Sequence, residues 1–458
     1  MVPAHIFREY DIRGDADRDL TDGIVHQIAQ GIAWYLHQHG VDAIALGRDG
    51  RLHSPRIHHT LCRALVRQGI SLLDVGLVPT PMLYFAIHHL GVQAGVQITG
   101  SHNPGPDNGF KIGLGTGGTV YGAALQQIRQ RIEAGPFEPA HTPGQARPVS
   151  VFTPYIHYIA SQLRLGPYRP QVALDAGNGA GGPIGLALLR RLGFPVVPLH
   201  CEIDGRFPHH HPDPTVAENL RDLQQAVAAH PPCVGLALDG DADRLGAVDE
   251  TGRILWGDQL LLLLAKAVLR EKPGARFVAE VKCSQVLYDE IAKAGGTITM
   301  ARVGHSLIKQ TMREVGADLA GELSGHLFFQ HRYLGYDDGL YAACRLLEML
   351  SHDPRPLSAW MDEIPVRYNT PEIRISAPDE TKFAQVEQFI SHAKTWPDVK
   401  IIDIDGARVE WSDGWALVRA SNTQPALVLR FEAASPERMQ AIRERVEKAL
   451  NEQYPQRN

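Results

Sequence analysis

Three carboxylates stand at alternate positions in one short loop, Asp239, Asp241 and Asp243, directly after a strand-like apolar run. Carboxylates at this spacing can converge on one hard cation, because only a cation offsets their mutual repulsion. An EF-hand calcium loop that starts at Asp239 needs glycine where Arg244 stands, so Mg²⁺ completed by a phosphate oxygen is favoured. The alternative is a solvated acidic turn.

A serine, Ser101, is presented at the end of a strand-like run in a loop of Gly, Pro and Asn, which exposes it on a rigid backbone. The hydrolase elbow G-x-S-x-G is absent, because Asn103 stands where its second glycine is needed, so acyl transfer is disfavoured. Phosphoryl transfer needs an oxygen to carry the group, a cation and a nearby basic residue such as Lys111. Taken alone, Ser101 is better explained as a turn residue than as a nucleophile, and only the residues around it favour the second interpretation.

Two further groups could bind the rest of a phosphorylated sugar. The first combines a carboxylate, a hydroxyl and an imidazole beside glycines, which suits sugar hydroxyls. The second combines a cation, two hydroxyls and an amide between strand-like runs, which suits a phosphate. As structural turns both would be ordinary. The first group is Glu322, Ser324 and His326, and the second is Arg419, Ser421, Asn422 and Thr423.

Two motifs favour other functions. Residues 177–182 match G-x-G-x-x-G between a strand-like and a helix-like segment, with Glu202 further on, as in an NAD(P)-binding oxidoreductase. A tight strand-to-helix turn explains the same match without a cofactor. The run His209-His210-His211 suggests zinc, but adjacent histidines in an extended segment point in alternating directions, so we interpret them as loop residues.

Composition indicates a folded globular chain. Its 458 residues include 45 Lys and Arg against 51 Asp and Glu, for a net charge of −6, with 44% hydrophobic and 21% charged residues. These values exclude disordered and fibrous classes. The sequence contains no tract of Lys and Arg, so no binding surface for nucleic acid or anionic lipid is expected. The longest apolar stretch, after Gln259, is broken by Lys266 and falls far short of the roughly 20 residues that cross a bilayer, so it predicts a buried helix.

The expected compartment is the cytoplasm. The five cysteines are scattered and form no C-x-x-C pair, which fits neither a disulfide framework nor a thiolate metal site. Arg8, Glu9 and Asp11 precede any apolar core near the N-terminus, so no secretory signal is expected.

The elements that must position these loops alternate short apolar runs with helical segments, a pattern typical of α/β units. Four of these runs lead into loops rich in Gly, Asp or Asn, and such loops at the carboxyl ends of strands bind ligands. We therefore expect one composite cleft. Beyond residue 366 the pattern changes to antiparallel strands and a charged helix, which predicts a small α+β domain.

A series of segments along essentially the whole chain resembles the α-D-phosphohexomutase superfamily and, within it, the bacterial phosphomannomutase/phosphoglucomutase branch. They are FREYDIRG, GRDGR, TGSHNPGPDNGFK, DGRFPHHHPDPTVAENL, DGDADR, VGHSLIK, GELSGH, GYDDG and RASNTQP. The resemblance implies three similar α/β domains with mixed sheets and a smaller C-terminal α+β domain around a central cleft. We place these domains at residues 1–146, 147–251, 252–365 and 366–458.

The resemblance also implies roles for individual residues. Ser101 would be the phosphoserine, and its phosphate would complete a Mg²⁺ site formed by Asp239, Asp241 and Asp243. Lys111 is expected to transfer the proton at the reacting hydroxyl, with His326 as the second candidate. The resemblance gives the two residue sets described above the same roles. Sugar hydroxyls would be bound by Glu322, Ser324 and His326, and a phosphate would be bound by Arg419, Ser421, Asn422 and Thr423. Further substrate contacts would come from Tyr10, Arg13, Arg244, Lys282 and His305.

The implied reaction is reversible phosphoryl transfer between O1 and O6 of mannose and glucose phosphates, through a hexose 1,6-bisphosphate, with glucose 1,6-bisphosphate as activator. RASNTQP and the final histidine of GELSGH favour dual mannose and glucose specificity. The expected partners are small hexose phosphates, without nucleic acid or membrane, and the chain is expected to act as a monomer. The alternatives are phosphoglucosamine mutase, the NAD(P)-binding oxidoreductase, and a sugar-phosphate-binding protein without catalysis.

Overall fold

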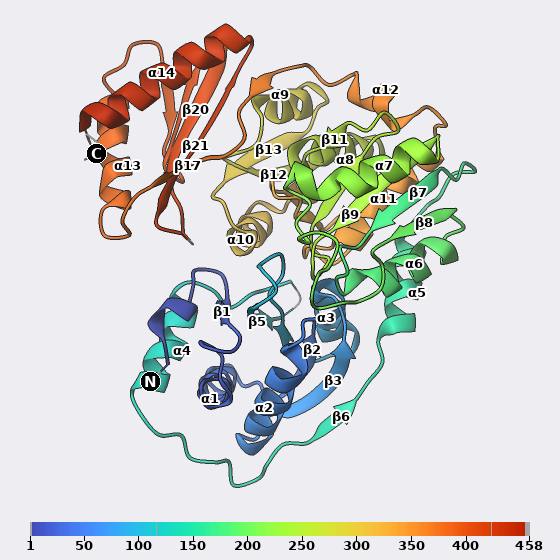
Figure 1. The fold of residues 1–458 in the computed structure, drawn as a ribbon, viewed down its shortest axis with the longest axis vertical. Coiled ribbons are helices and arrows are strands. Elements are labelled where there is room, and N and C mark those ends of the chain that lie inside the picture. The colour runs from blue at the N-terminus through green and yellow to red at the C-terminus, as the bar shows by residue number, and fades with distance from the viewer. Residues whose placement is uncertain (1, 116, 423, 454–458) are drawn as a thin grey trace.

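The structure, a computed structural model, describes residues 2–115, 117–422 and 424–453. The chain forms four domains, each built on its own sheet, that follow one another around a central cleft (Figure 1). The predicted class is confirmed: three domains have mixed sheets covered by helices, and the fourth is a smaller antiparallel α+β domain.

Domain I has the sheet order β1-β5-β4-β2-β3-β6. Neighbours from β4 to β6 run parallel, whereas β5 and β1 extend the β4 edge antiparallel. Apolar residues of α1, α2 and α4 cover one face, and α3 covers the other. The elements are η1 Ala4–Ile6, β1 Ile12–Asp15, α1 Asp22–Gln38, β2 Ala43–Arg48, α2 Ser54–Arg67, β3 Ser71–Leu77, α3 Thr80–His89, β4 Ala94–Ile98, β5 Asp107–Leu114, α4 Ala123–Glu133 and β6 Ala146–Pro148.

Domain II repeats the plan with the order β11-β10-β9-β7-β8, in which the last three strands are parallel and β10 and β11 are antiparallel additions. Strand β9 is buried along its whole length, as its continuous apolar sequence predicts. The elements are α5 Phe152–Gln162, β7 Gln171–Asp175, α6 Gly181–Arg191, β8 Val196–Leu199, η2 Ala217–Leu220, α7 Arg221–Ala229, β9 Cys233–Leu238, β10 Leu245–Val248 and β11 Ile254–Leu255.

Domain III has the order β13-β12-β14-β15, parallel except for the last pair. Helix α9 begins at an N-cap, Ser284, whose side chain accepts a hydrogen bond from the Val286 N–H, and α10 ends at Gly316 in the left-handed conformation. The elements are α8 Gly257–Glu271, β12 Arg276–Glu280, α9 Gln285–Lys293, β13 Thr297–Ala301, α10 His305–Val315, β14 Leu319–Gly321, β15 Leu327–Phe329, α11 Gly339–Ser351 and α12 Leu357–Met361.

Domain IV is an antiparallel sheet, β16-β21-β20-β19-β18 with β17 also on β21, covered by two helices. It docks on domain III through Arg408, whose guanidinium donates to the carbonyls of Val281 and Cys283 at 2.7 and 2.8 Å. The Arg408 guanidinium also lies 4.0 Å from the ring of the buried Trp415. The elements are β16 Tyr368–Asn369, β17 Ile373–Ser376, α13 Lys382–Ala393, β18 Lys400–Ile402, β19 Ala407–Trp411, β20 Gly414–Ala420, β21 Ala426–Ala433 and α14 Pro436–Gln453.

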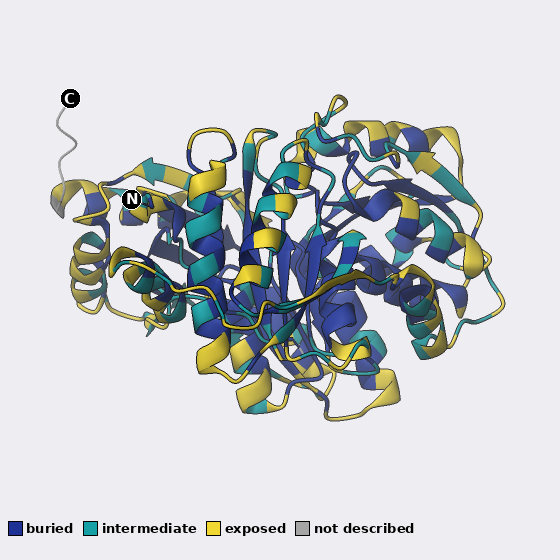
Figure 2. Ribbon diagram, turned by 90° about the horizontal axis from the view of Figure 1, so that it is seen from below, coloured by how far each residue is buried: buried dark blue, intermediate teal, exposed yellow. Residues whose placement is uncertain are grey.

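One apolar core joins the first three domains. It combines α3 with α5, α6, α8 and α11, and Figure 2 shows the sheets and inward helix faces as one buried interior under exposed outer helices. The predicted buried helix after Gln259 is α8, which lies in this core. Within the described residues, no helix is both long and apolar enough to span a membrane.

The predicted domain boundaries differ by a few residues from the sheets. The boundary after residue 251 falls in the turn between β10 and β11, and the boundary after residue 146 falls at the start of β6, which pairs with β3. The physical reason is that a Gly-containing polar turn has the same composition in a hairpin as in a linker.

All four loops with predicted chemistry occupy one topological position. Each joins two antiparallel neighbours: β4 to β5 for Ser101, β9 to β10 for the aspartates, β14 to β15 for Glu322, and β20 to β21 for Arg419. In the first three domains this hairpin is where the antiparallel extension joins the parallel strands. The repeated fold therefore brings one functional loop from each domain to the centre.

The buried carboxylate of Asp338 supports α11 and the shared core. It accepts a hydrogen bond from the Tyr341 N–H at 2.9 Å, as the N-cap of α11, and from the hydroxyls of Tyr155 at 2.9 Å and Tyr333 at 2.6 Å. Burial raises the pKa of Asp338 to about 6. The cap and the tyrosines hold α5 and the residues before α11 to the start of α11.

We expect Asp338→Ala to lower the free energy of unfolding by about 3 kcal/mol or more, since it removes a cap and leaves two buried hydroxyls without their acceptor. Urea denaturation measures this loss. The matched control is Ser284→Ala, which removes a cap alone and should cost about 1 kcal/mol. Equal losses in the two variants would contradict the role given to Asp338.

Candidate active site

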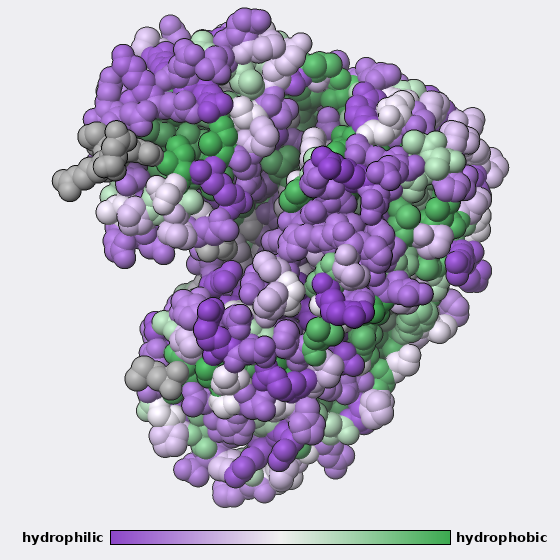
Figure 3. Space-filling view, viewed as in Figure 1, coloured by the Kyte–Doolittle hydropathy of each residue, from purple (hydrophilic) through white to green (hydrophobic). Residues whose placement is uncertain are grey.

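A cleft of about 1220 Å³ lies where the four domains meet, and residues from all of them line it. Figure 3 shows the hollow between the N-terminal and C-terminal parts of the molecule. The predicted residues that line the cleft are Tyr10, Arg13, Ser101, Lys111, Arg244, Lys282, His305, Glu322, Ser324, His326, Arg419, Ser421 and Asn422. Thr423 lies outside the described residues. The three aspartates lie buried behind the lining.

Ser101 sits in the β4–β5 loop with its backbone in the left-handed region, at a φ of 48°. Its N–H donates to Thr99 Oγ1 at 2.8 Å, and its hydroxyl donates to Asp239 Oδ2 at 3.1 Å. The loop packs so closely on the aspartate loop that a Cβ on Gly240 would lie 2.5 Å from the Ser101 carbonyl oxygen. The serine hydroxyl is thus fixed beside the carboxylates.

Arg51 holds the backbone of this loop. Its buried guanidinium donates to the carbonyls of Ser101 at 2.7 Å, Asn103 at 2.6 Å, Pro104 at 2.6 Å and Asp107 at 2.8 Å. The side chain passes so close to the chain that any Cβ on residue 100 would collide with it, which requires the glycine found there.

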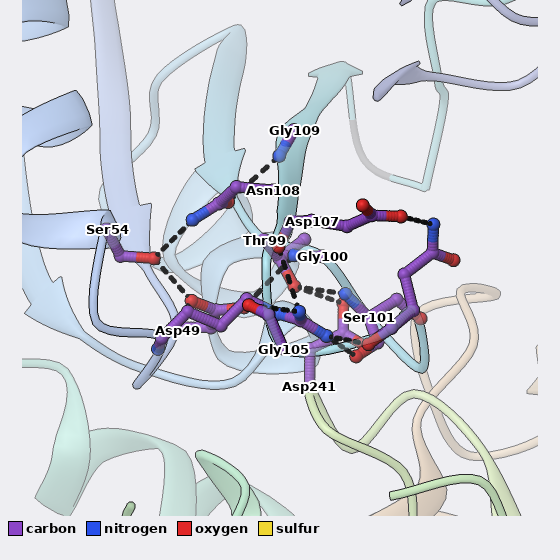
Figure 4. A network of polar contacts seen from close by, with 12 residues as sticks. Asp49, Ser54, Thr99, Gly100, Ser101, Gly105, Asp107, Asn108, Gly109 and Asp241 are labelled. Carbon is purple, nitrogen blue, oxygen red and sulfur yellow. Dashed lines mark hydrogen bonds and ion pairs between the residues drawn. The ribbon is translucent and has the colours of Figure 1, made fainter. Parts of the chain in front are cut away.

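The carboxylate of Asp49 holds the backbone of Arg51 and of Gly100 in place. It accepts hydrogen bonds from the N–H of Arg51 at 3.0 Å and of Gly100 at 3.1 Å, and from Ser54 Oγ at 2.5 Å. Ser54 in turn accepts from Asn108 Nδ2 at 2.9 Å. Figure 4 shows that these contacts connect both ends of the Ser101 loop to the start of α2. The loop is therefore held by a network within domain I.

Asp239, Asp241 and Asp243 each offer a carboxylate oxygen, and these oxygens lie within 4.8 Å of one another. All three residues are at most 1% exposed. Burial and the neighbouring aspartates raise the pKa of Asp239 well above its ordinary value. Burial opposes ionisation of Asp241 as well, but Lys111 outweighs it and lowers the pKa of Asp241. Only added positive charge lets all three ionise together.

Lys111 of β5 supplies part of that charge from domain I. Its Nζ lies 2.7 Å from Asp241 Oδ2 and also contacts Asp243 Oδ2. Burial alone would lower the pKa of Lys111, but these two carboxylates raise it well above its ordinary value. Lys111 is therefore a fixed cation in this arrangement.

The aspartate site fits a divalent metal ion. Asp241 Oδ1 and Asp243 Oδ1 are buried and have no hydrogen-bond partner, which is costly for carboxylate oxygens unless a cation takes them. The donors are all oxygens, the set that Mg²⁺ prefers. Ser101 Oγ, 3.1 Å from Asp239, lies where a further oxygen ligand could be added.

His326 and Arg244 both line the cleft, and their side chains contact each other. Arg244 Nε donates to His326 Nε2 at 3.0 Å, and His326 Nδ1 lies 3.1 Å from Asp337 Oδ2. Because Nε2 accepts, the neutral ring carries its proton on Nδ1, on the side of Asp337. Lys309 Nζ lies 3.2 Å from Asp337 Oδ1. Asp337 is the nearer of two carboxylates beside His326 Nδ1, and the other is Asp243, whose Oδ1 lies 3.7 Å away.

The sugar-hydroxyl loop is held by two carboxylates. Glu322 Oε1 accepts from the Gly304 N–H at 2.8 Å, and Glu280 Oε1 accepts from the Leu323 N–H at 2.8 Å. Burial raises the pKa of Glu280 to about 7. His305, at the start of α10, stacks on His326 with ring centroids 5.6 Å apart, and burial lowers its pKa well below the ordinary value. His305 is therefore held neutral.

The far end of the cleft is basic and lies between domains III and IV. Arg419 Nη2 is 3.2 Å from Asp405 Oδ2, and Lys282 Nζ is 2.7 Å from Glu372 Oε1. Lys282 lowers the pKa of Glu372 to about 2. Tyr10 of domain I reaches this end, where its hydroxyl accepts from Asn422 Nδ2 at 2.9 Å and donates to the Val303 carbonyl at 2.7 Å. A phosphate here would meet several cationic groups.

The Gly-rich turn at 177–182 packs closely against two other segments of domain II. A Cβ on Gly179 would lie 2.6 Å from the Gly240 carbonyl oxygen, and one on Gly182 would lie 2.1 Å from the Cys201 carbonyl oxygen. These glycines let the turn lie against the aspartate loop and the chain after β8, where a dinucleotide phosphate would have to bind. The NAD(P) alternative is not favoured.

Sequence reasoning missed the residues that support the site: Arg51, Glu280, Lys309, Asp337 and Asp405. Three of them stand in segments that the sequence analysis had quoted, Arg51 in GRDGR, Lys309 in VGHSLIK and Asp337 in GYDDG. Their charged residues beside glycines are a signal, but the sequence does not say which group each one contacts.

Comparison with known proteins gives the family. Four models, "Phosphoglucomutase/phosphomannomutase" alpha/beta/alpha domains I, II and III and the C-terminal domain, match residues 4–139, 153–252, 256–368 and 372–449. "Phosphomannomutase/phosphoglucomutase" of Pseudomonas aeruginosa is 44% identical over 443 residues, 96% of this chain and 94% of that protein. "Phosphoglucomutase" of Neisseria gonorrhoeae is 45% identical over 456 residues, 99% and 98% of the two chains.

Solved structures agree. A phosphoglucomutase/phosphomannomutase family protein from Burkholderia thailandensis has a TM-score of 0.94 and 38% identity, and the match covers 100% of this chain and 99% of that one.

We expect Arg51→Lys to loosen the Ser101 loop, because one ammonium group cannot reach the carbonyls that a guanidinium fork bridges. Amide hydrogen exchange of residues 101–108 should accelerate at least about tenfold, the equivalent of about 1.4 kcal/mol. The control is Arg56→Lys, because Arg56 also donates to backbone carbonyls, those of Ala16 and Leu20, but outside this loop. Unchanged exchange in Arg51→Lys would contradict the role of the guanidinium.

Proposed function

Because the chain belongs to the phosphoglucomutase/phosphomannomutase family, we propose that it interconverts hexose 1-phosphates and hexose 6-phosphates through a phosphorylated Ser101. The observation that carries the proposal is the position of Ser101. Its hydroxyl lies 3.1 Å from Asp239, beside a carboxylate cluster fit for a divalent cation and at the edge of a cleft with cationic groups at both ends.

We assign the cation to Mg²⁺, held by Asp239, Asp241 and Asp243 with the phosphate on Ser101 as a further ligand. When bound, the ion neutralises charge on the phosphoryl group that is transferred. Arg13, whose guanidinium donates to the Gly100 carbonyl at 2.6 Å, and Lys111 add fixed positive charge on the domain I side.

In the first half-reaction the free hydroxyl of a hexose monophosphate attacks phosphorus. The bond from phosphorus to Ser101 Oγ breaks as the bond to the sugar oxygen forms. The hydroxyl proton passes to a protein base, and a protein acid gives a proton to Ser101 Oγ, which loses it again in the second half-reaction. The product is a hexose 1,6-bisphosphate. After it turns over in the cleft, Ser101 Oγ takes the other phosphoryl group, and the base returns its proton to the sugar oxygen. Added glucose 1,6-bisphosphate would activate the enzyme by phosphorylating Ser101.

Two residues are candidates for the proton transfer. Lys111, protonated between Asp241 and Asp243, is fit to donate a proton or a hydrogen bond, and it can accept one only when those carboxylates are engaged elsewhere. His326 has its Nδ1 3.1 Å from Asp337 Oδ2, and its Nε2 accepts a hydrogen bond from Arg244 Nε in the cleft. We propose Lys111 and His326 as this acid–base pair.

The distal phosphate would bind at the basic end formed by Arg419, Ser421, Asn422, Tyr10 and Lys282. Its separation from Ser101 across the cleft supports binding of the sugar in either orientation, with one phosphate at each end. Thr423 belongs to the same predicted group. Glu322 and Ser324, on the loop between these ends, would then meet hydroxyls common to both orientations.

We propose mannose and glucose phosphates as substrates. The name of the P. aeruginosa relative includes both activities, whereas that of the N. gonorrhoeae relative includes phosphoglucomutase alone. The dual assignment is supported by the RASNTQP and GELSGH segments. The proposal includes a cytoplasmic monomer.

Ser101→Ala should lose nearly all mutase activity and take up no ³²P from labelled glucose 1,6-bisphosphate, because it has no oxygen to carry the group. The matched control is Ser324→Ala in the same cleft, which should still take up label while its KM rises. Near-normal turnover by Ser101→Ala would refute the proposed carrier.

A second test compares glucose 1-phosphate, mannose 1-phosphate and glucosamine 1-phosphate with Mg²⁺ and a trace of glucose 1,6-bisphosphate. Comparable kcat/KM for the first two, at least about tenfold above the third, is expected if Glu322 and Ser324 bind shared hydroxyls. Turnover of glucosamine 1-phosphate alone would keep the mechanism and overturn the sugar assignment. No turnover of any would favour a non-catalytic sugar-phosphate-binding protein.

A further inference from the structure

A second cluster of metal-ligating side chains lies in domain II, outside the cleft. Asp175 at the end of β7, His200 directly after β8 and His210 in the segment that follows each offer one ligand atom, and these atoms lie within 4.8 Å of one another. Figure 1 shows β7 and β8 side by side, and none of the three residues is among those that line the cleft. We propose that Asp175, His200 and His210 bind one borderline transition-metal ion of the Zn²⁺, Co²⁺ or Ni²⁺ class.

The hydrogen bonds of His210 favour a cation at this point. Its Nδ1 lies 2.9 Å from the His211 carbonyl oxygen, and its Nε2 lies 3.0 Å from Asp175 Oδ2. Both neighbours only accept hydrogen bonds, whereas a neutral imidazole has one N–H to donate. Either the ring is doubly protonated, or Nε2 presents its lone pair to a cation that it shares with Asp175.

The dimensions suit a metal. Two ligand atoms about 2.0–2.1 Å from one tetrahedral ion lie roughly 3.3 Å apart, close to the 3.0 Å between His210 Nε2 and Asp175 Oδ2. The third ligand atom, from His200, lies within 4.8 Å of the other two. The Asp175 side chain is 1% exposed, and the His200 and His210 side chains are 13% and 14% exposed, so the anchor is fixed and the rings are accessible to an ion.

Both histidines have the outer partners typical of metal ligands. A carbonyl holds Nδ1 of His210, and Asp222 Oδ2 lies 3.0 Å from Nε2 of His200. His200 also has a φ of 47°, in a region that residues other than glycine rarely adopt. Asn178 N–H donates to its carbonyl at 2.7 Å, which fixes this conformation. The cluster is thus built before any ion arrives.

The donor set separates this site from the aspartate cluster. Two imidazoles and one carboxylate favour Zn²⁺, Co²⁺ or Ni²⁺ over Mg²⁺, whereas three carboxylates favour Mg²⁺. Bound metal would tie the segment after β8 to the end of β7. That segment continues to Asp213, which lines the cleft 3.9 Å from Arg244. The ion would therefore stiffen one wall of the cleft without taking part in the chemistry.

The test is titration of the full-length protein with Co²⁺ in excess Mg²⁺, followed by visible absorption and calorimetry. We expect one site with the ligand-field bands of nitrogen and oxygen ligands. His200→Asn, which keeps a residue that tolerates positive φ, and His210→Gln should each abolish these bands. Asp222→Asn should weaken binding about 10- to 100-fold. The control is His58→Ala, since His58 and Asp74 form an isolated pair at 3.1 Å.

A third cluster, Asp243, His326 and Asp337, competes as an explanation because it also mixes imidazole and carboxylates. Co²⁺ bands that survive His200→Asn and His210→Gln but disappear in His326→Gln would overturn the proposal. No binding in the wild-type protein would also overturn it and would identify the His210–Asp175 contact as an ion pair. Far-ultraviolet circular dichroism of each variant establishes that the fold is retained.

Discussion

Three carboxylates buried in one loop repel one another, and domain I supplies groups that offset this repulsion. Lys111 reaches across from domain I to Asp241 and Asp243, and the Thr80 hydroxyl of domain I donates to Asp241 at 2.5 Å. The Thr80 N–H also donates to the Asp241 carbonyl at 3.0 Å. These polar contacts add to the apolar core between the first two domains, and they also place a cation and a hydroxyl beside the aspartates.

The shape of the cleft follows from a repeated piece of topology. In each domain the functional loop joins two antiparallel neighbours, and in the first three domains it lies where parallel strands give way to an antiparallel extension. Loops at this edge share one orientation relative to their sheets, so domains arranged in a ring bring them to a common centre. The charge differs from loop to loop: acidic in domain II, basic in domain IV. One repeated piece of topology thus supplies four loops of different chemistry to a single cleft.

The sequence predicted the loops that line the cleft better than it predicted the residues that hold those loops in place. Ser101, the aspartates and Glu322 stand in segments dense in Gly, Asp or Ser, where local composition alone indicates function. Arg51 acts on carbonyls that lie some 50 residues further along the chain, and Asp337 acts through His326 in another hairpin. Only the tertiary fold creates such pairs. The Gly-rich turn at 177–182 suggested an NAD(P) site because close packing and phosphate binding both require glycine. The sequence alone does not separate the two causes.

Arg51 contacts the Ser101 loop through backbone carbonyls alone, and every residue has a carbonyl. The guanidinium therefore places no demand on which side chains the loop carries at positions 102 to 106. The residues whose identity this contact does constrain are Arg51 itself and Gly100, whose missing side chain leaves room for the Arg51 guanidinium. Descendants of such a chain could change the side chains that line this part of the cleft while Ser101 keeps its place beside Asp239.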